Sequence, residues 1–323
     1  MALPWRSTAL WLLILCFNVQ AAVDPSKVRK IPLRSHSLSS PFLDSEISSR
    51  FFEFGEDTIV RTDQYIRLTS DRPSQDGWLF SRLPLTATNW QIEVEFKIHG
   101  VGNLHGDGMA IWVTEQRASP GSVFGHADKF KGLGIFIDTY KNHRPGTVFP
   151  YVSAMLGNGT ESYDKDNDNK DTELTGCSAR GLRTASVPTK IRLTYYQEDS
   201  FRVELQYKAA DEWTDCFETG ALKLPPVNYL GFSAETGELT DNHDIIQVQS
   251  YNMHISEVWK GTESGDRSGK NRKGKGKNYD PNRGRQSGGW AWFFLKLLLL
   301  PVIAAGGYVG WTMYRASNRG SRF

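Results

Sequence analysis

The 323-residue sequence has no excess of charge of either sign, no internal repeat and no long amphipathic helical pattern before residue 290. Lysine and arginine number 38 and aspartate and glutamate 36, for a formal net charge of +2. A nucleic-acid partner is therefore not expected, because such proteins carry a strongly basic face. The missing 3.6-residue period argues against a helical fold for most of the chain.

Cysteine is scarce, with three residues in the whole sequence. Cys16 lies in an apolar N-terminal segment, which leaves Cys177 and Cys216. If the chain enters an oxidising compartment, this even pair predicts a disulfide. It would close a loop of about 40 residues and stabilise the fold by roughly 4 kcal/mol on the chain-entropy model. Two free buried thiols are the alternative.

Long apolar runs occur only near the two ends of the sequence. Residues 1–22 combine Arg6, an apolar run over 9–19 and the small residues Ala21 and Ala22. This layout predicts a secretory signal peptide cleaved after Ala21 or Ala22, with an uncleaved anchor as the alternative. Asn158 begins an Asn-Gly-Thr sequon, which in a secreted chain predicts N-glycosylation of a surface turn.

Residues 290–314 form the second apolar run. As a helix they would measure about 37 Å, enough to cross a hydrocarbon core of about 30 Å. Trp290, Trp292 and Tyr314 lie near its ends, as interfacial aromatics do. We predict a single-pass type I protein with a cytosolic tail over 315–323; a buried core helix is the alternative. The basic stretch 260–285 would then be lumenal, against the positive-inside tendency, but long domains translocate largely regardless of charge.

Residues 50–258 show a period of two. Apolar side chains alternate with polar ones over 90–98 and 201–208, which predicts strands with one solvated face. Residues 109–113 and 133–137 are continuously apolar and fit strands covered on both sides. Many strands separated by Gly-, Pro- and Asn-rich turns predict an all-β, two-sheet antiparallel sandwich or jelly roll.

The segments that flank this predicted domain differ from it in composition. Residues 23–49 are expected to be a leader into the fold. Residues 259–289 are rich in Gly, Lys, Arg, Asn and Ser and nearly free of apolar residues, which predicts a flexible stalk. A basic patch for acidic lipids or glycans is the alternative.

Three polar clusters interrupt the strands, at 105–108, 138–142 and 163–171. The second and third supply carboxylate and amide oxygens of the kind that calcium takes as ligands. An EF-hand beginning at Asp164 is excluded, because its sixth position would be Asn169 and its twelfth Thr175. A solvated acidic loop is the alternative for the third cluster alone.

With these motifs in place, residues 50–258 resemble the leguminous-type (L-type) lectin domain of animal and fungal intracellular lectins. Among these, the vesicular integral-membrane lectins and the mannose-lectin cargo receptor of the intermediate compartment share the stalk, span and short tail. The resemblance rests on four segments taken together: GDGMAIW at 106–112, PGSVFG at 120–125, GIFIDTY at 134–140 and TGELTDNHD at 236–244.

The resemblance implies a concanavalin-like jelly roll with a calcium-dependent mannose site. Asp107 would accept hydrogen bonds from mannose, after a cis Gly106–Asp107 bond. The implied calcium ligands are Asp138, the backbone carbonyl of Tyr140, Asn142 and Asp168. Asn142 would serve both calcium and sugar. The other implied sugar contacts are the backbone of Gly237, Glu238 and Leu239, and Ser74.

Two positions depart from the family pattern. Lys165 stands where relatives have a sugar-contacting histidine; it can donate to a hydroxyl but is longer, more flexible and charged. Glu238 stands where relatives often have Asp or Gly in the closing loop. Calcium ligation is expected to be intact, whereas sugar affinity and glycan-length preference are put in question.

The resemblance predicts a non-enzymatic lectin that binds high-mannose N-glycans on glycoprotein cargo between endoplasmic reticulum and Golgi. Its tail would bind vesicle coat proteins. In relatives a terminal hydrophobic pair acts as the export signal, and here only Phe323 of that pair is present. The alternative is a tail that no coat protein binds and that only flanks the membrane span. Two other functions stay open. One is a sugar-inactive calcium-binding scaffold, suggested by Lys165. The other is a jelly-roll glycoside hydrolase using Glu93 and Glu95, which share one strand face.

Overall fold

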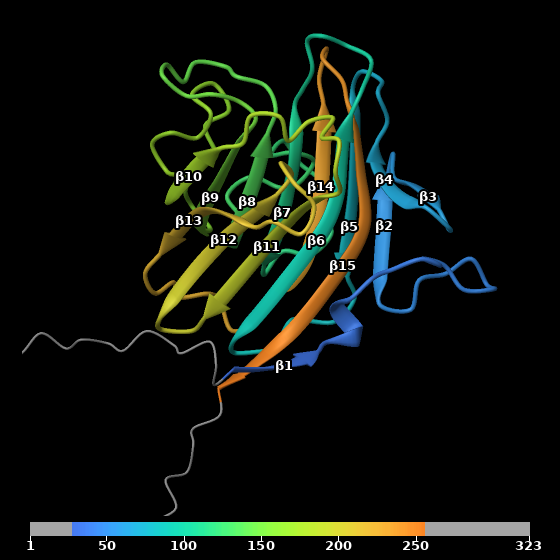
Figure 1. Ribbon diagram of the computed structural model, residues 1–323, viewed down its shortest axis with the longest axis vertical. Coiled ribbons are helices and arrows are strands. Elements are labelled where there is room, and N and C mark those ends of the chain that lie inside the picture. The colour runs from blue at the N-terminus through green and yellow to red at the C-terminus, as the bar shows by residue number, and fades with distance from the viewer. Residues whose placement is uncertain (1–27, 256–323) are drawn as a thin grey trace, which may run out of the picture. The chain divides into compact units, whose positions relative to one another are not determined.

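The computed structural model describes residues 28–255, which form a two-layered antiparallel sandwich (Figure 1). The all-β, two-sheet prediction is confirmed. The predicted signal peptide, stalk, membrane span and cytosolic tail lie outside the described residues. Within 28–255, no helix is long and apolar enough to cross a membrane.

The larger sheet has eight strands in the order β13-β12-β11-β6-β15-β4-β3, with β1 also paired to β15. Its strands are β1 (Val28–Pro32), β3 (Ile59–Arg61), β4 (Tyr65–Thr69), β6 (Trp90–His99), β11 (Thr189–Tyr196), β12 (Ser200–Gln206), β13 (Thr214–Thr219) and β15 (Asn242–Ile255). A short 3-10 turn, η2 (Arg34–His36), follows β1.

The smaller sheet has seven strands in the order β10-β9-β8-β7-β14-β5-β2. Its strands are β2 (Phe52–Glu56), β5 (Gln75–Ser81), β7 (Gly108–Thr114), β8 (Lys131–Asp138), β9 (Tyr151–Asn158), β10 (Thr175–Ser178) and β14 (Tyr229–Thr236).

The alternating strands lie in the larger sheet, whose outer face is solvated. In β6 the apolar side chains from Trp90 to Ile98 point into the core, whereas Glu93, Glu95 and Lys97 point outward. Arg192 on the neighbouring β11 pairs with Glu93 at 2.9 Å, and Lys190 pairs with Glu95 at 3.7 Å. Cross-strand charge pairs of this kind stabilise a wet sheet face modestly.

The continuously apolar strands lie in the smaller sheet, where every residue of β7 is buried. One face packs against the main core and the other beneath a second cluster that includes Trp112, Phe124, Phe130, Phe136 and Tyr163. The loops after β7 and β9 supply part of this outer layer. A sheet covered on both faces needs apolar residues at successive positions, which explains the uninterrupted runs.

Cys177 in β10 and Cys216 in β13 form the predicted disulfide, with their Cα atoms 5.3 Å apart. β10 and β13 are edge strands of different sheets. The bond therefore joins the two layers along one side of the sandwich.

The segment before residue 50 contributes to the larger sheet. β1 pairs with the last part of β15, with Val28 opposite Ile255, and Leu38 forms a bridge with Val248. Both ends of the described chain therefore leave at the same end of the sandwich. β15 starts beside the end of β6, with Asn242 opposite His99, so the loop after β6 lies at the other end.

Candidate functional site

Asp107 lies at that other end, just before β7, and is held on both sides by backbone contacts. Thr139 donates its amide and its hydroxyl to the carbonyl of Asp107 at 3.0 and 3.1 Å. The Asp107 amide donates to the carbonyl of Glu235 at 3.2 Å. The Gly106–Asp107 bond is cis, as the resemblance implied. Gly108 adopts φ of 145°, and a Cβ there would collide with the carbonyl of Ile137, so this position requires glycine.

The four residues expected to hold calcium lie together on two loops. Asp138 ends β8 and accepts the amide of Tyr140 at 3.0 Å. Asp168 comes from the 163–171 loop, and its Oδ1 accepts both the backbone amide and the side-chain Nδ2 of Asn142 at 3.0 Å. Asn142 Nδ2 also donates to the carbonyl of Lys165 at 2.9 Å. A pocket of about 210 Å³ is lined by Asp138, Tyr140 and Asn142 together with Asp107.

Charge and burial at this cluster fit a divalent cation. Asp138 and Asp168 are 6% and 3% exposed. The Oδ2 atom of Asp168 is buried with no hydrogen-bond partner among the described residues. Burial, and then the nearby charge of Asp168, hold the pKa of Asp138 well above its usual range. Buried carboxylates are retained only when paired or bound to metal, and a cation would supply the missing partner.

This ligand set is not a cluster of acidic or histidine side chains. Over residues 28–255, no group of three or more His, Cys, Asp or Glu side chains is placed to hold a metal. The candidate set has two carboxylates, and the remaining oxygens are an amide and a backbone carbonyl. Such mixed oxygen donors are common for calcium.

Arg144 joins the two loops that carry the expected calcium ligands. Its guanidinium donates to the carbonyl of Asp168 at 3.3 Å and pairs with both carboxylate oxygens of Glu173. It also lies over the ring of Tyr151, 4.4 Å from the centroid. The guanidinium is thus committed to Glu173, and its charge offsets only part of the rise in the pKa of Asp138 that burial and Asp168 cause.

The closing loop after β14 lies beside Asp107. A Cβ on Gly237 would sit 3.3 Å from Oδ2 of Asp107, so the glycine leaves that carboxylate accessible. A Cβ on Gly106 would sit 3.1 Å from Cβ of Tyr140 and 3.6 Å from Cβ of Leu239, so both side chains lie beside this glycine. The amide of Ser74 donates to the carbonyl of Gly237 at 3.0 Å, which places Ser74 at the same loop. Glu238 is exposed, and the residues that line the pocket include none of the expected contacts Ser74, Gly237, Glu238 and Leu239.

Lys165 lines the pocket but is held by a residue that the sequence did not single out. Its Nζ donates to both carboxylate oxygens of Glu235, at 2.8 and 2.7 Å. Burial raises the pKa of Asp107, the charges of Glu235 and Asp76 raise it further, and Lys165 opposes them. Lys165 is therefore the local counter-charge of an acidic group and does not simply replace a histidine.

Two aromatic side chains of the pocket were also missed. Phe124 and Tyr163 line it next to Asp138, with ring centroids 5.7 Å apart in an edge-to-face arrangement. Phe124 belongs to the PGSVFG segment, and Tyr163 precedes the acidic loop. The sequence signal for Tyr163 was an aromatic residue at the start of an otherwise polar cluster.

Asn158 is the last residue of β9 and is exposed. Its side-chain oxygen accepts the amide and hydroxyl of Thr160, both at 2.8 Å, so the sequon forms a compact turn. In a chain expressed through the secretory pathway, we expect N-glycosylation at this site. Peptide N-glycosidase should increase the gel mobility of the wild type. It should leave Asn158→Gln unchanged; an equal shift in both would place the glycan elsewhere.

The two carboxylates considered for a hydrolase do not form a catalytic pair. Glu93 and Glu95 both point outward from β6, and each is engaged by a basic side chain of β11. They lie on the outer face of the larger sheet, away from the pocket that contains Asp107. A glycosidase needs one carboxyl on each side of the scissile bond, with one of them protonated.

The comparisons with known proteins place this chain in a family. The model of the legume-like lectin family matches residues 29–259. The VIP36-like protein of Homo sapiens is 43% identical over 227 residues, which cover 69% of this chain and 64% of that protein. The vesicular integral-membrane protein VIP36 of Homo sapiens is 39% identical over 256 residues, or 78% of this chain and 71% of that protein. The chain thus spans slightly less than two thirds of the length of the VIP36-like relative.

Solved structures agree with these relatives. The VIP36 exoplasmic/lumenal domain in its Ca2+/Man-bound form superposes with a TM-score of 0.67 at 38% identity, covering 71% of this chain and 94% of that one. Its metal-free form gives a TM-score of 0.66 at 39% identity, covering 70% and 95%. The Emp47p carbohydrate recognition domain, at 21% identity and a TM-score of 0.56 over 71% and 98%, shares the fold. The chain belongs to the legume-like lectin family.

Proposed function

We propose that this chain is a calcium-dependent lectin for mannose, carried on high-mannose N-glycans. The observation that carries the proposal is the unpaired, buried Oδ2 of Asp168 beside buried Asp138. Asn142 is hydrogen-bonded to Asp168 and lines the same pocket as Asp107. In this proposal, the side-chain amide of Asn142 therefore connects the cation site to the carboxylate that accepts the sugar.

In this proposal Asp138, the carbonyl of Tyr140, Asn142 and Asp168 hold the calcium ion. Calcium would supply positive charge that offsets the two buried carboxylates and fixes the loops, with no part in bond making. Asp107 and Asn142 then meet the hydroxyls of one hexose. The Gly237 and Leu239 backbone would close one side, with Ser74 behind that loop, and the aromatic edge of Phe124 and Tyr163 would form an apolar wall.

The relatives support this reading. The VIP36 lumenal domain has been solved in Ca2+/Man-bound and metal-free forms. The pocket of this chain is lined by Asp138, Tyr140 and Asn142, which carry oxygens of the kind that calcium takes as ligands. Asp107 is available, because Gly237 leaves its carboxylate uncovered.

The test is calorimetric titration of mannose and of a high-mannose oligosaccharide into residues 23–258, with calcium and with chelator. We expect saturable binding with calcium and none with chelator. Weak affinity for a single mannose is expected, because each hydroxyl contact replaces one to water and contributes only about 1 kcal/mol net. A calcium-loaded, folded domain that binds no mannose-containing glycan contradicts the proposal.

A second candidate function is a sugar-inactive scaffold that keeps the calcium site. The Lys165–Glu235 pair favours it, because a bidentate ion pair occupies part of the pocket wall. Calcium binding without any response to sugar would support this scaffold.

The pair itself can be tested by a double-mutant cycle. Lys165→Ala leaves Glu235 uncompensated next to Asp107, so mannose affinity should fall by about two- to fivefold, the range expected of a half-exposed ion pair. The double variant Lys165→Ala with Glu235→Ala should return to within about twofold of the wild type. Lys170→Ala, exposed in the same loop, is the matched control. Additive losses in the double variant would mean that Lys165 contacts the sugar directly.

We further propose that the chain is a single-pass type I cargo receptor between endoplasmic reticulum and Golgi, whose tail is read by vesicle coats. The proposed parts are a signal peptide over 1–22, a stalk over 259–289, a span over 290–314 and a tail over 315–323. Its relatives named vesicular integral-membrane proteins support this reading. A tag at residue 323 in intact vesicles tests the topology. Protease added outside the vesicles should digest the tag, because the tail would face the cytosol.

A further inference from the structure

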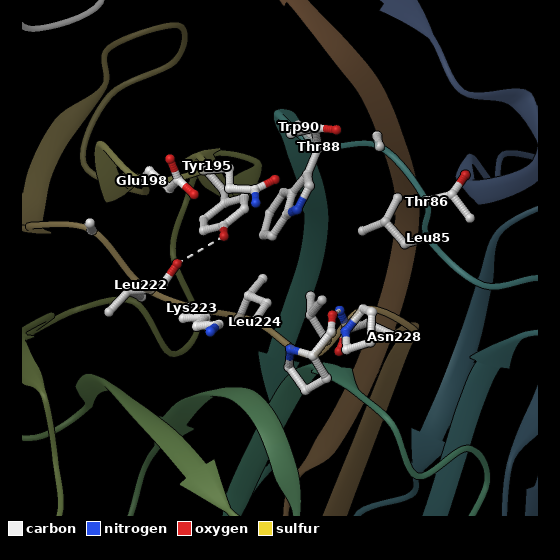
Figure 2. A pocket seen from close by; sticks show the side chains of 16 residues that line it. Leu85, Thr86, Thr88, Trp90, Tyr195, Glu198, Leu222, Lys223, Leu224 and Asn228 are labelled. Atoms are coloured by element: carbon white, nitrogen blue, oxygen red, sulfur yellow. Dashed lines mark hydrogen bonds between the residues drawn. The ribbon is translucent and has the colours of Figure 1, made fainter.

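The loops at the two ends of the sandwich are fastened in different ways. At the end where β6 begins, the hydroxyl of Tyr195 donates to the carbonyl of Leu222 at 2.9 Å, and this neutral contact ties the loop before β14 to β11 (Figure 2). At the Asp107 end, charged side chains connect three loops, which cover residues 70–74, 100–106 and 237–241. The last of these is the closing loop.

Arg183, in the segment between β10 and β11, bridges two of these loops with one guanidinium. Its Nε donates to the two carboxylate oxygens of Asp241 at 3.1 and 2.8 Å. Its Nη2 donates to the same carboxylate at 2.8 Å and to the carbonyls of Gly100 and Gly102 at 3.2 and 3.1 Å. A planar guanidinium presents several donors in a fixed fork, so these contacts set both the distance and the angle between the loops.

Asp71 makes a second bridge between the same two loops. Its carboxylate accepts the hydroxyl of Thr240 and, at 3.0 Å, the amide of Val101. A Cβ on Gly100 would collide with the carboxylates of both Asp241 and Asp71, so the backbone of this loop lies directly against the two charged groups. The loop before Asp107 and the closing loop are therefore joined through side chains on two further segments of the chain.

The pair of Arg183 and Asp241 is almost removed from solvent. The side chain of Asp241 is 0% exposed and that of Arg183 is 14% exposed. Moving either loop away would leave a buried charge without its partner, which is strongly unfavourable. The pair therefore resists relative motion of the two loops.

The two bridged loops lead directly to the proposed sugar site. The 100–106 loop runs into Asp107, and the closing loop begins at Gly237, where a Cβ would lie 3.3 Å from Oδ2 of Asp107. Arg183, Asp71 and Asp241 are not among the residues that line the pocket. Any effect of these three side chains on a ligand must therefore pass through the loops.

From these contacts we propose that Arg183 is a positioning residue for sugar binding, which fixes the distance between Asp107 and the closing loop. It acts through the carboxylate of Asp241 and the carbonyls of Gly100 and Gly102. The inference rests on the proposed mannose site, although the closing loop is held in the absence of sugar as well. Without Arg183, the closing loop samples positions from which its backbone misses the hexose.

A nitroxide label on Glu238→Cys reports the mobility of the closing loop without any sugar. Glu238 is exposed, and Cys177 and Cys216 are joined in a disulfide, so the introduced thiol is the one available in the described part of the chain. The experiment uses the full chain in detergent with saturating calcium, and the chain without the new cysteine gives the background. Arg183→Met should shorten the rotational correlation time of the label at least about twofold.

Two controls separate this effect from a general loosening of the fold. Arg180→Met, an equal change at an exposed position three residues earlier, should leave the Glu238→Cys label unchanged. A label on Ala210→Cys, exposed in the loop between β12 and β13, should be unaffected by Arg183→Met.

Calorimetric titration of mannose into the same full-length variants measures the consequence for the site. Arg183→Met should lose about five- to twentyfold in affinity, the value of one to two hydrogen bonds, and should keep the calcium-induced rise in unfolding temperature. Arg183→Lys keeps the charge but not the fork, so its affinity should lie between those of Arg183→Met and the wild type. Arg183→Met combined with Asp241→Asn leaves no unpaired buried charge, and should bind as weakly as Arg183→Met alone.

The failure of this inference and the failure of the proposed function give different results. A wild-type chain that binds no mannose contradicts the proposed function, and the label then still decides whether Arg183 holds the closing loop. An unchanged label in Arg183→Met overturns the inference. Wild-type affinity in the double variant also overturns it, because the loss would then come from the unpaired charge of Asp241. If Arg183→Met does not fold, the double variant and Arg183→Lys supply both measurements.

Discussion

Asp138→Asn is expected to abolish calcium binding and yet to leave the metal-free domain more stable than the wild type at neutral pH. Burial and the charge of Asp168 raise the pKa of Asp138 in the folded, metal-free chain. The folded state therefore binds that proton more tightly than the unfolded state does. Stability falls as the pH rises from the usual aspartate pKa towards the raised value. Asparagine removes the buried charge and its repulsion with Asp168, so a gain of about 1–3 kcal/mol is expected.

Thermal unfolding of both proteins, in chelator and in calcium, checks this prediction. Calcium at about 100 times its dissociation constant should stabilise the wild type by roughly 2.7 kcal/mol, or about 5–10 °C in a domain of this size. The variant should show no shift. Asp171→Asn, exposed on the same acidic loop, should keep the calcium response. A calcium shift that persists in Asp138→Asn would remove this residue from the ligand set.

Asp107→Asn is expected to reduce mannose affinity by about 100-fold while leaving the calcium shift in place. The variant keeps the shape of the side chain but loses the charged acceptor. Two charge-assisted hydrogen bonds at about 1.5 kcal/mol each account for a loss of that order. Titration with mannose should show no detectable binding at concentrations that saturate the wild type. Retained sugar binding would show that the hexose lies elsewhere.

In the proposed site, the same carboxylate is expected to make sugar binding sensitive to acid. Burial and the charges of Glu235 and Asp76 raise the pKa of Asp107, and only the ionised form accepts two hydroxyl donors. Affinity should therefore decline on acidification earlier than it would for an aspartate of ordinary pKa. Calcium must be kept saturating at each pH, so that protonation of its ligands is not mistaken for this effect.

Local patterns were sufficient to predict the strands over 90–98, 109–113, 133–137 and 201–208. The alternation from Trp90 to Ile98 matches β6, and the apolar run from Met109 to Val113 matches the centre of β7. These patterns reflect which face each side chain turns to the core, and such information is local. The pairing of β1 with β15 joins residues more than 200 positions apart, and no local period encodes it.

The site was predicted less completely than the fold. Asp107, Asp138, Asn142 and Asp168 were named from the family resemblance. The structure places Asp107, Asp138 and Asn142 in one pocket, with Asp168 hydrogen-bonded to Asn142. Glu235 was missed because it lies inside the apparent strand β14, 70 positions from Lys165. The partner that decides the role of Glu235 is thus distant in sequence.

Val28 and Ile255 leave the sandwich side by side, while Asp107 lies at the far end. A force applied between Asp107 and either end of the described chain would therefore act along the length of the sandwich. In the proposed receptor, tension between a glycan held at the Asp107 end and a tether beyond Ile255 would run lengthwise along β15. The hydrogen bonds from β15 to β1, β4 and β6 would then be loaded together in shear, and would not open one after another. Strand pairing in this direction would resist such a load.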